Sequence, residues 1–158
     1  MFVGRVPAAE LETWDNFIAG EGLLNNGRCM LEWKRADGPK KAPEAPRTFV
    51  GMDAERRYLW LFVSGGRLTG RRKSMGLSYF DASDVLGWFG CANGVNLDGG
   101  GSTTLAMRAD AMPAKPESCT PECHRAKVQG YWILNCTSDG RERRVLDHLL
   151  FLDAASAK

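Results

Sequence analysis

The chain has 158 residues, of which 44% are hydrophobic and 25% charged, and its formal net charge is +2. This is the composition of an ordinary globular domain, long enough to bury about 70% of its unfolded surface in one core. No apolar run approaches the ~20 residues of a membrane span, and the first residues lack the apolar segment of a signal peptide. We expect one domain over residues 1–158 with no membrane span and no nucleic-acid partner, and its localisation stays unknown.

The cysteines are too scattered to define a disulfide framework, and their odd number leaves at least one free thiol in a monomer. They are Cys29, Cys91, Cys119, Cys123 and Cys136. Cys119, Cys123 and His124 lie close together, but their spacing is not that of a zinc site and no second pair follows. This pattern favours a surface insertion with at most one local disulfide over a metal site.

The first 46 residues predict a helix, a hairpin and a loop. Residues 8–19 place apolar side chains at helical spacing and are followed by Gly20, which indicates a short amphipathic helix. Residues 23–33, "LLNNGRCMLEW", have Asn-Asn-Gly between apolar stretches, a hairpin signal. Residues 36–46 contain three prolines and no apolar pattern, which is typical of a surface loop.

From Arg47 the pattern changes to β-structure. Residues 47–53 and 58–64 are rich in β-branched and aromatic residues, and the four residues between them form a plausible turn. A glycine-rich, basic loop follows, and it leads to Ser78 with Asp81 three residues later, a variant of the capping box. The expected helix then places Ala82, Val85, Leu86 and Phe89 on one face and has Gly90 just past its end.

The rest of the chain predicts short strands around one excursion. Residues 94–98, 103–108, 128–135 and 148–152 have strand composition, and residues 109–127 are a proline-containing, polar insertion. We expect an α+β fold, a single domain with a mixed β-sheet and one or two packed helices. Its central sheet would use the segments near Arg47, Tyr58, Val95, Thr103, Gly130 and Leu149.

Three consecutive glycines, Gly99, Gly100 and Gly101, stand between Asp98 and a Ser-Thr-Thr run. They could simply form a sharp turn or bulge, which is what glycine commonly does between strands. They could instead let the backbone approach an anionic ligand, with the N–H groups and the hydroxyls of Ser102 and Thr103 as donors. No lysine precedes the serine as in a P-loop, and no GxGxxG pattern opens a helix, so neither nucleotide motif fits.

The segment "NLDGGGSTT", residues 96–104, resembles the signature of the phosphodiester glycosidase family. Three further segments resemble family motifs in the same order: "RTFVGMD" (47–53), "MGLSYFDASDVL" (75–86) and "LNCTSDGRERRVLDHLLF" (134–151). The resemblance covers residues 47–152, and residues 109–127 stand out as an insertion. Family domains have an upstream portion that contributes to the cleft and has no counterpart here, so a homo-oligomer could complete the cleft.

The resemblance implies a hydrolase that cleaves the sugar–phosphate glycosidic bond of a sugar-1-phosphodiester, such as an N-acetylglucosamine-1-phosphodiester. Such cleavage passes through an oxocarbenium-like state that a carboxylate stabilises directly or by activating water. Asp98 is the first catalytic candidate, and Asn96 and Asp139 are the others. The alternative is a catalytically inactive module that binds sugar phosphates or anionic glycans.

The expected substrate-binding residues are Arg47, Gly99, Gly100, Gly101, Ser102, Thr103 and Arg143. A guanidinium fork suits phosphate oxygens, although either arginine could form a structural ion pair with Asp139 or Asp98 instead. Asn96 would lie two residues before Asp98 on the same strand face, where it could orient that carboxylate or bind a sugar hydroxyl. No metal site is expected. Ca²⁺ is the one cofactor left open, although no calcium-loop pattern is present.

Overall fold

The computed structural model describes residues 18–31, 43–67, 74–111, 130–139, 143–145 and 149–151. The expected helix over residues 8–19 falls outside these ranges except for Ile18 and Ala19, which are not helical. The loop with Cys119 and Cys123 also lies outside them. Among the other cysteines, Cys136 is disulfide-bonded, whereas Cys29 and Cys91 are free thiols.

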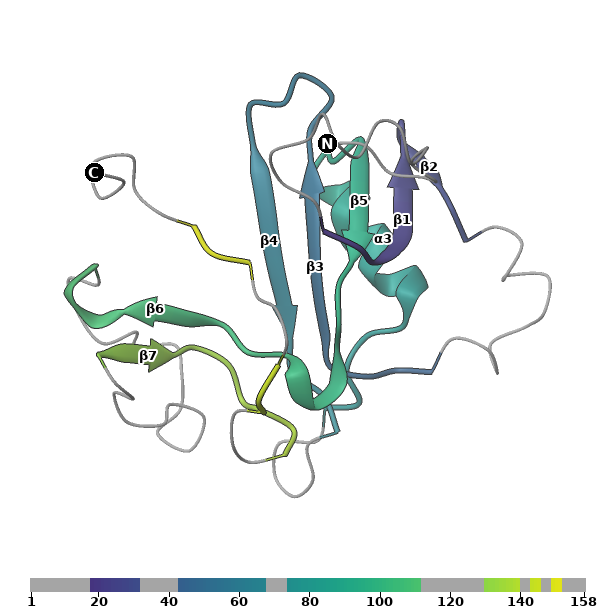
Figure 1. Ribbon diagram of the computed structural model, residues 1–158. Helices are drawn as coiled ribbons and strands as arrows, with labels where there is room; N and C mark the ends of the chain where they lie inside the picture. The colour runs from purple at the N-terminus through teal and green to yellow at the C-terminus, as the bar shows by residue number, and fades with distance from the viewer. Residues whose placement is uncertain are drawn as a thin grey trace.

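A five-stranded antiparallel sheet forms the centre of the molecule, with α3 behind it in the view of Figure 1. Its order is β2-β1-β5-β3-β4. The strands are β1 (Glu21–Asn25), β2 (Arg28–Cys29), β3 (Arg47–Met52), β4 (Leu59–Ser64) and β5 (Asn93–Asn96). Both hairpins predicted within this region, β1–β2 and β3–β4, are confirmed.

The two hairpin turns have different local causes. Asn26 and Gly27 both have positive φ, 49° and 75°, as a two-residue turn of type I′ requires. In the β3–β4 turn, the Asp53 carboxylate accepts the backbone N–H groups of Arg57 and Tyr58 at 2.8 and 2.9 Å. The Asp53 N–H in turn donates to the Tyr58 carbonyl, so the aspartate closes the turn from both sides.

The predicted capping box begins α3 (Tyr79–Trp88). The Asp81 N–H donates to Ser78 Oγ at 3.2 Å, and the Ser78 N–H donates to the Asp81 carboxylate at 2.8 Å. These two bonds satisfy backbone donors that an uncapped helix would leave unpaired. Gly90, with φ 74°, follows the C-cap residue Phe89 and ends the helix as expected.

The helix packs closely on the sheet because two sheet positions lack a side chain. A methyl group built on Gly51 would lie 2.5 Å from Leu86 Cδ2, and one on Gly94 would meet the other Leu86 methyl. Leu86 is fully buried between these glycines. The core around it consists of Leu23, Leu24, Leu31, Phe49, Ala82, Leu86 and Cys91.

A second, two-stranded sheet of β6 (Ala106–Arg108) and β7 (Tyr131–Ile133) extends to the left in Figure 1. The 3₁₀ turn η2 (Gly100–Ser102) precedes it, and η3 (Ala109–Ala111) follows β6. The strands expected near Thr103 and Gly130 therefore exist, but they pair with each other and not within the central sheet. That part of the expectation was wrong, since β1 and β2 complete the central sheet instead.

The expected last strand over residues 148–152 was also wrong where it can be compared. Leu149–Phe151 are exposed and pair with no strand among the described residues. The α+β fold class is confirmed, with one α-helix among the described residues. None of the described helices is long and apolar enough to cross a membrane.

Candidate functional site

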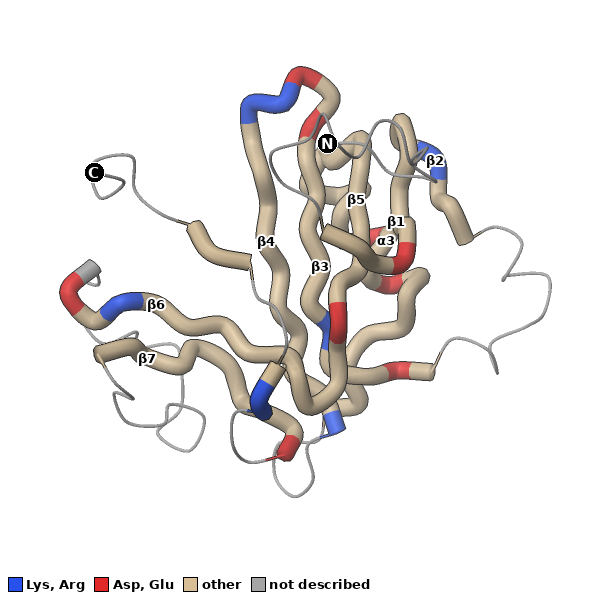
Figure 2. Tube along the Cα trace, in the orientation of Figure 1, with Lys and Arg blue, Asp and Glu red and all other residues tan. Residues whose placement is uncertain are grey.

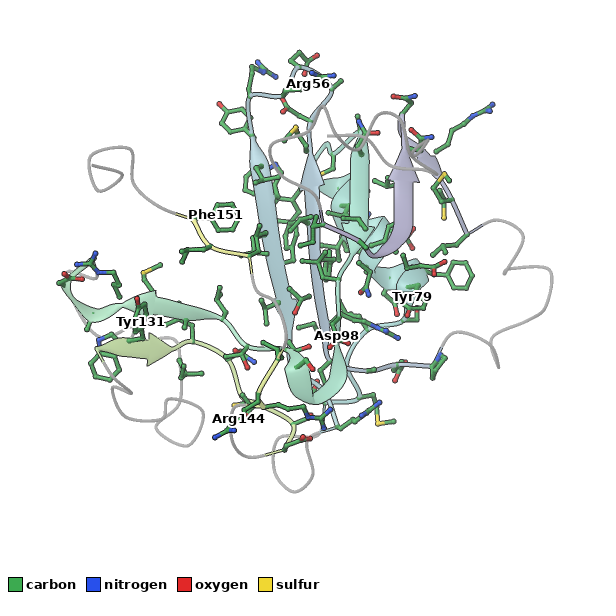
Figure 3. The ribbon with its side chains drawn as sticks, in the orientation of Figure 1. Arg56, Tyr79, Asp98, Tyr131, Arg144 and Phe151 are labelled. Carbon is green, nitrogen blue, oxygen red and sulfur yellow. The ribbon has the colours of Figure 1, made fainter. Side chains whose placement is uncertain are left out.

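The glycine triplet forms the turn that leaves β5 and enters the 3₁₀ turn η2, at one end of the central sheet. Figure 3 shows Asp98 beside this turn, at the opposite end of the strands from Arg56. Asp98 is exposed, and its Oδ1 accepts the N–H of Gly99 at 2.8 Å. The other carboxylate oxygen has no hydrogen-bond partner among the described residues, so it is available to a ligand.

Two of the glycines are required by the main chain of Pro46 and by the turn itself. A methyl group on Gly99 would lie 2.7 Å from the Pro46 carbonyl oxygen. Gly100 has φ 63°, and its N–H donates to that same carbonyl at 2.9 Å. The turn is therefore joined to the residue before β3. A side chain at Gly99 would clash with Pro46, and one at Gly100 would be held in a left-handed conformation that favours glycine.

The third glycine lies against an ion pair from the far end of the chain. Arg143 Nη2 donates to Asp139 Oδ2 at 2.5 Å. Gly101 is buried beneath this pair, and a methyl group built on it would lie 2.5 Å from Arg143 Nη2 and would overlap Asp139 Oδ2. The structure thus brings three predicted site residues into contact.

Asn135 positions the segment that carries Asp139. Its Nδ2 donates to the Thr103 carbonyl at 2.8 Å, and its Oδ1 accepts the Leu105 N–H at 2.7 Å. The Leu134 N–H also donates to the Leu105 carbonyl at 2.8 Å. These bonds join the strand after the glycine turn to the strand before Asp139. The candidate list from the sequence did not include Asn135, although it lies in a segment that resembles a family motif.

A second arginine lies over the turn and was not predicted. Arg67 follows β4, is exposed and has φ 55°, a left-handed conformation that is uncommon for a residue with a side chain. Its Nη1 lies 3.4 Å from the position of a methyl group on Gly100. Two guanidinium groups therefore flank adjacent glycines. The glycine-rich, basic loop after β4 was the only sequence signal for this residue.

The ion pair has a clear electrostatic effect on Asp139. The hydrogen bond from Arg143 lowers the pKa of this carboxyl from its usual 3.8, and the Ser138 hydroxyl and the charge of Arg67 act in the same direction. Burial opposes the shift without cancelling it. Figure 2 shows basic and acidic positions close together at this end of the sheet. Asp139 is consequently an anion at neutral pH.

The polar side chains on either side of the turn are more buried than Asp98. Asn96 is 4% exposed, and its Nδ2 donates to the Leu97 carbonyl at 2.5 Å. No hydrogen bond joins Asn96 to Asp98 in the described part of the chain. Asn96 Oδ1 and Thr103 Oγ1 are buried polar atoms without a hydrogen-bond partner among the described residues. Such atoms are uncommon in folded proteins.

Most backbone donors of the motif are already used within the turn. The N–H groups of Ser102 and Thr103 donate to the carbonyls of Gly99 and Gly100, both at 3.2 Å. Those of Gly99 and Gly100 bond to Asp98 and Pro46 as described above. Among the N–H groups of residues 99–103, only that of Gly101 has no acceptor in the described part of the chain. The turn thus offers one main-chain donor, fewer than the expected nest of several.

Arg47 is 7% exposed and forms no ion pair with Asp98 or Asp139 among the described residues. Its Nε donates to the Leu77 carbonyl at 3.0 Å, and its Nη2 donates to the Pro43 carbonyl at 2.8 Å. Its guanidinium also lies 4.0 Å from the centre of the Tyr79 ring. These contacts tie the start of β3 to the segment before α3, which is the surrounding of a structural arginine.

The described residues contain no group of three or more histidine, cysteine or acidic side chains that could hold a metal ion. The site therefore consists of one open carboxylate, one ionised and paired carboxylate, two guanidinium groups and one free N–H. This set suits an anionic oxygen ligand next to a carboxylate.

Comparison with known proteins agrees with these features. A model of the phosphodiester glycosidase family matches residues 2–152. The chain belongs to this family. The match extends beyond the resembling segments at 47–152 to nearly the start of the chain. No curated protein sequence matches the chain.

Two solved structures resemble parts of the protein. One is a hypothetical protein from Synechocystis, with 29% sequence identity and a TM-score of 0.41 over 54% of this chain and 16% of that one. The other is the zebrafish N-acetylglucosamine-1-phosphodiester alpha-N-acetylglucosaminidase catalytic domain, auto-inhibited by its pro-peptide. It has 26% identity and a TM-score of 0.42 over 55% of this chain and 31% of that one. The chain therefore spans less than a third of either solved chain.

Proposed function

We propose that this chain is a hydrolase of sugar-1-phosphodiesters that cleaves the bond between the anomeric carbon and the phosphate oxygen. The observation that carries the proposal is the contact of Gly101 with the Asp139–Arg143 pair, next to Arg67 and the open carboxylate of Asp98. Membership of the phosphodiester glycosidase family supports the same reaction class.

The reaction adds one water molecule across the glycosidic bond. The water oxygen ends on the anomeric carbon, and the bonding electrons leave with the phosphate oxygen as a phosphomonoester. Because a phosphate is a good leaving group, the reaction depends less on a general acid than ordinary glycoside hydrolysis does. Stabilising the cationic sugar and binding the departing phosphate are then the main tasks of the site.

Asp98 is suited to the first task. The Gly99 N–H holds one of its oxygens in place, and the second oxygen can face the sugar or a water molecule. In this role the carboxylate stabilises positive charge that develops at the anomeric carbon or accepts a proton from the attacking water. Asn96, two residues earlier, is buried, so in this proposal it supports the turn from below and does not contact the sugar.

Arg67 and Arg143 are suited to the second task. Their guanidinium groups lie over Gly100 and Gly101, and both are partly or fully exposed. Planar guanidinium donors and the free N–H of Gly101 would bind phosphate oxygens through charge-assisted hydrogen bonds. Asp139 is a poor proton donor because its pKa is lowered, and in this proposal it holds Arg143 in position.

The test is the release of free N-acetylglucosamine from its α-1-phosphodiester by the purified chain. We expect turnover by the wild type and at least a 100-fold loss in kcat for Asp98→Asn, with a smaller change in KM. Asp84→Asn is the matched control, since Asp84 is an exposed carboxylate on α3, which lies behind the central sheet in Figure 1. Its activity should equal that of the wild type.

The assay also separates the two functions considered for this fold. A folded wild-type chain that binds N-acetylglucosamine-1-phosphate by calorimetry but shows no turnover would be a sugar-phosphate binding module. A folded chain that shows no binding and no turnover would overturn the proposal altogether. Addition of Ca²⁺ in a parallel reaction tests whether the cation left open by the sequence contributes.

A further inference from the structure

Among the residues that the structure describes, no strand pairs with the outer edge of β4 in the central sheet. β4 (Leu59–Ser64) bonds to β3 along its whole length, and its other side faces away from the sheet in Figure 1. None of its six residues is charged or a proline. Unpaired edges of this kind are normally protected by charges, proline, bulges or a very short strand, because they pair readily with other chains.

The opposite edge of the same sheet has two of these protections. β2 consists of two residues only, and one of them is an exposed arginine, Arg28. β4 is three times as long as β2. At the start of β4, Leu59 is 45% exposed, and Tyr58 just before it is 59% exposed. The contrast indicates that the β4 edge pairs with a strand of another chain, whereas the β2 edge is protected against such pairing.

The hydrogen-bond pattern shows which backbone groups point outward. The Asp53 N–H donates to the Tyr58 carbonyl, so this pair is hydrogen-bonded and bonding alternates from it along the ladder. Trp60, Phe62 and Ser64 therefore bond to β3. The N–H and carbonyl groups of Leu59, Leu61 and Val63 point away from β3, and none of them has a hydrogen-bond partner in the described residues.

We propose that two copies of this chain associate through β4, pairing antiparallel with Leu61 on the two-fold axis. This register places Leu61 opposite Leu61 and Leu59 opposite Val63, so all three outward-facing residues of each copy pair. A shift of two residues in either direction would leave one outward-facing residue of each copy unpaired. The two sheets would then form one continuous sheet across the interface.

The side chains are compatible with this self-pairing. Leu59, Leu61 and Val63 lie on one face of the strand and would meet only their own apolar counterparts across the axis. On the other face, Trp60 and Phe62 of the two copies would be opposite each other. Trp60 and Phe62 each contact the ring of Phe89, at 5.0 and 4.9 Å between centroids, so an aromatic surface from α3 adjoins the edge. No like charges would meet within the paired strands.

The proposed register also has a consequence for the candidate site. It places Tyr58 of one copy opposite Ser64 of the other, so the β3–β4 turn of one copy lies beside the segment that leads to Arg67 of the other. The dimer would therefore add a wall next to the arginine over Gly100. The inference does not depend on the proposed reaction, because a dimer can form whether or not the chain hydrolyses sugar phosphodiesters.

Analytical ultracentrifugation of the full chain tests the association. We expect the wild type to sediment as a dimer at micromolar concentration and Leu61→Lys as a monomer, because two lysines would face each other on the axis. Tyr58→Lys introduces the same charge opposite Ser64 and should stay dimeric. Circular dichroism must show that each variant is folded. A wild type that is monomeric up to 100 µM would overturn the proposal.

A cysteine at the axis tests the register. Residues in a hydrogen-bonded antiparallel pair have Cα atoms about 5.5 Å apart, within reach of a disulfide. Under mild oxidation Leu61→Cys should form a covalent dimer well above the wild-type background from Cys29. Tyr58→Cys is the control, since its two copies would be about 20 Å apart across six residues of strand. Equal cross-linking of both variants, or of neither, would exclude this register.

Discussion

At the scale of single residues, Gly101 is the glycine of the turn that contacts charged side chains, those of Asp139 and Arg143. The neighbouring glycines contact the main chain of Pro46, whereas Gly101 contacts the two charged side chains proposed to organise phosphate binding. Substitution there acts on the ion pair directly and leaves the hydrogen bond between Gly100 and Pro46 in place. A substitution at Gly101 therefore tests the function of the site without removing the hydrogen bond that holds the turn.

We expect Gly101→Ala to displace Arg143 from Asp139, because the added methyl group would overlap the Asp139 carboxylate. Activity or phosphate binding should fall at least tenfold, whereas the free energy of unfolding should change by less than about 0.5 kcal/mol, because the displaced atoms are the ends of exposed side chains. Gly87→Ala is the matched control, since nothing lies within 4 Å of a methyl group there. Its position in α3 predicts a gain of about 0.4–1 kcal/mol. Equal effects of the two substitutions in calorimetry and binding would contradict this account.

Prediction from the sequence succeeded least at this scale. The glycines and Asp98 could be singled out because they are adjacent, but their contacts are with Pro46, Arg67 and Asp139, which are distant in the sequence. Arg67 was missed because a lone arginine in a glycine-rich loop carries no signal of what it will face. Arg47 was assigned to the substrate, yet its surroundings are backbone carbonyls and Tyr79, which only the folded chain reveals.

At the scale of elements, local signals were reliable where a few adjacent residues determine the outcome. The capping box at Ser78 and the Asn26-Gly27 turn each contain their own hydrogen-bond or dihedral requirement, and both were predicted. Strand partners were predicted less well, because pairing depends on residues far along the chain. The strands found near Thr103 and Gly130, β6 and β7, belong to a separate sheet, and Leu149 lies in no described strand.

The capping box allows a quantitative test of element stability. Ser78→Ala removes the acceptor of the Asp81 N–H and should lower the free energy of unfolding by about 1 kcal/mol. Ser78→Gly should cost only a few tenths of this value, because glycine at an N-cap leaves the backbone donors accessible to water. Urea titrations of the three proteins measure the difference. A Gly variant less stable than the Ala variant would argue against a capping role.

At the scale of the whole molecule, acid stability follows from two carboxylates in different places. Asp53 closes the β3–β4 turn, and the Tyr58 N–H is the main cause of its lowered pKa, with further contributions from Arg57. Asp139 is lowered chiefly by Arg143. Each group has a lower pKa in the folded than in the unfolded chain, where it is about 3.8. Each therefore contributes stability above that pH and loses it as the pH falls through the folded value.

We expect the melting temperature to be steady from pH 7 to about 5 and to fall steeply below pH 4, since both carboxylates must then be protonated. Asp53→Asn should melt lower than the wild type at pH 7 and lose less on acidification, because its turn no longer depends on a charge. Differential scanning calorimetry from pH 2 to 7 provides the measurement. Parallel acid transitions for the two proteins would show that Asp53 does not contribute.

The close fit of Leu86 between Gly51 and Gly94 has a consequence for how this sequence can change over evolutionary time. Gly51 in β3, Leu86 in α3 and Gly94 in β5 pack against one another, so a larger residue at one of these positions requires a change at another. A side chain at Gly94 requires a smaller residue at 86, and one at Gly51 also requires Cys91 to move, since its sulfur would lie 2.6 Å from the new methyl group. A shorter residue at 86 leaves a void that a new methyl group on the sheet would refill. Among relatives, the sizes of these three residues should therefore vary together, with the helix keeping its distance from the sheet.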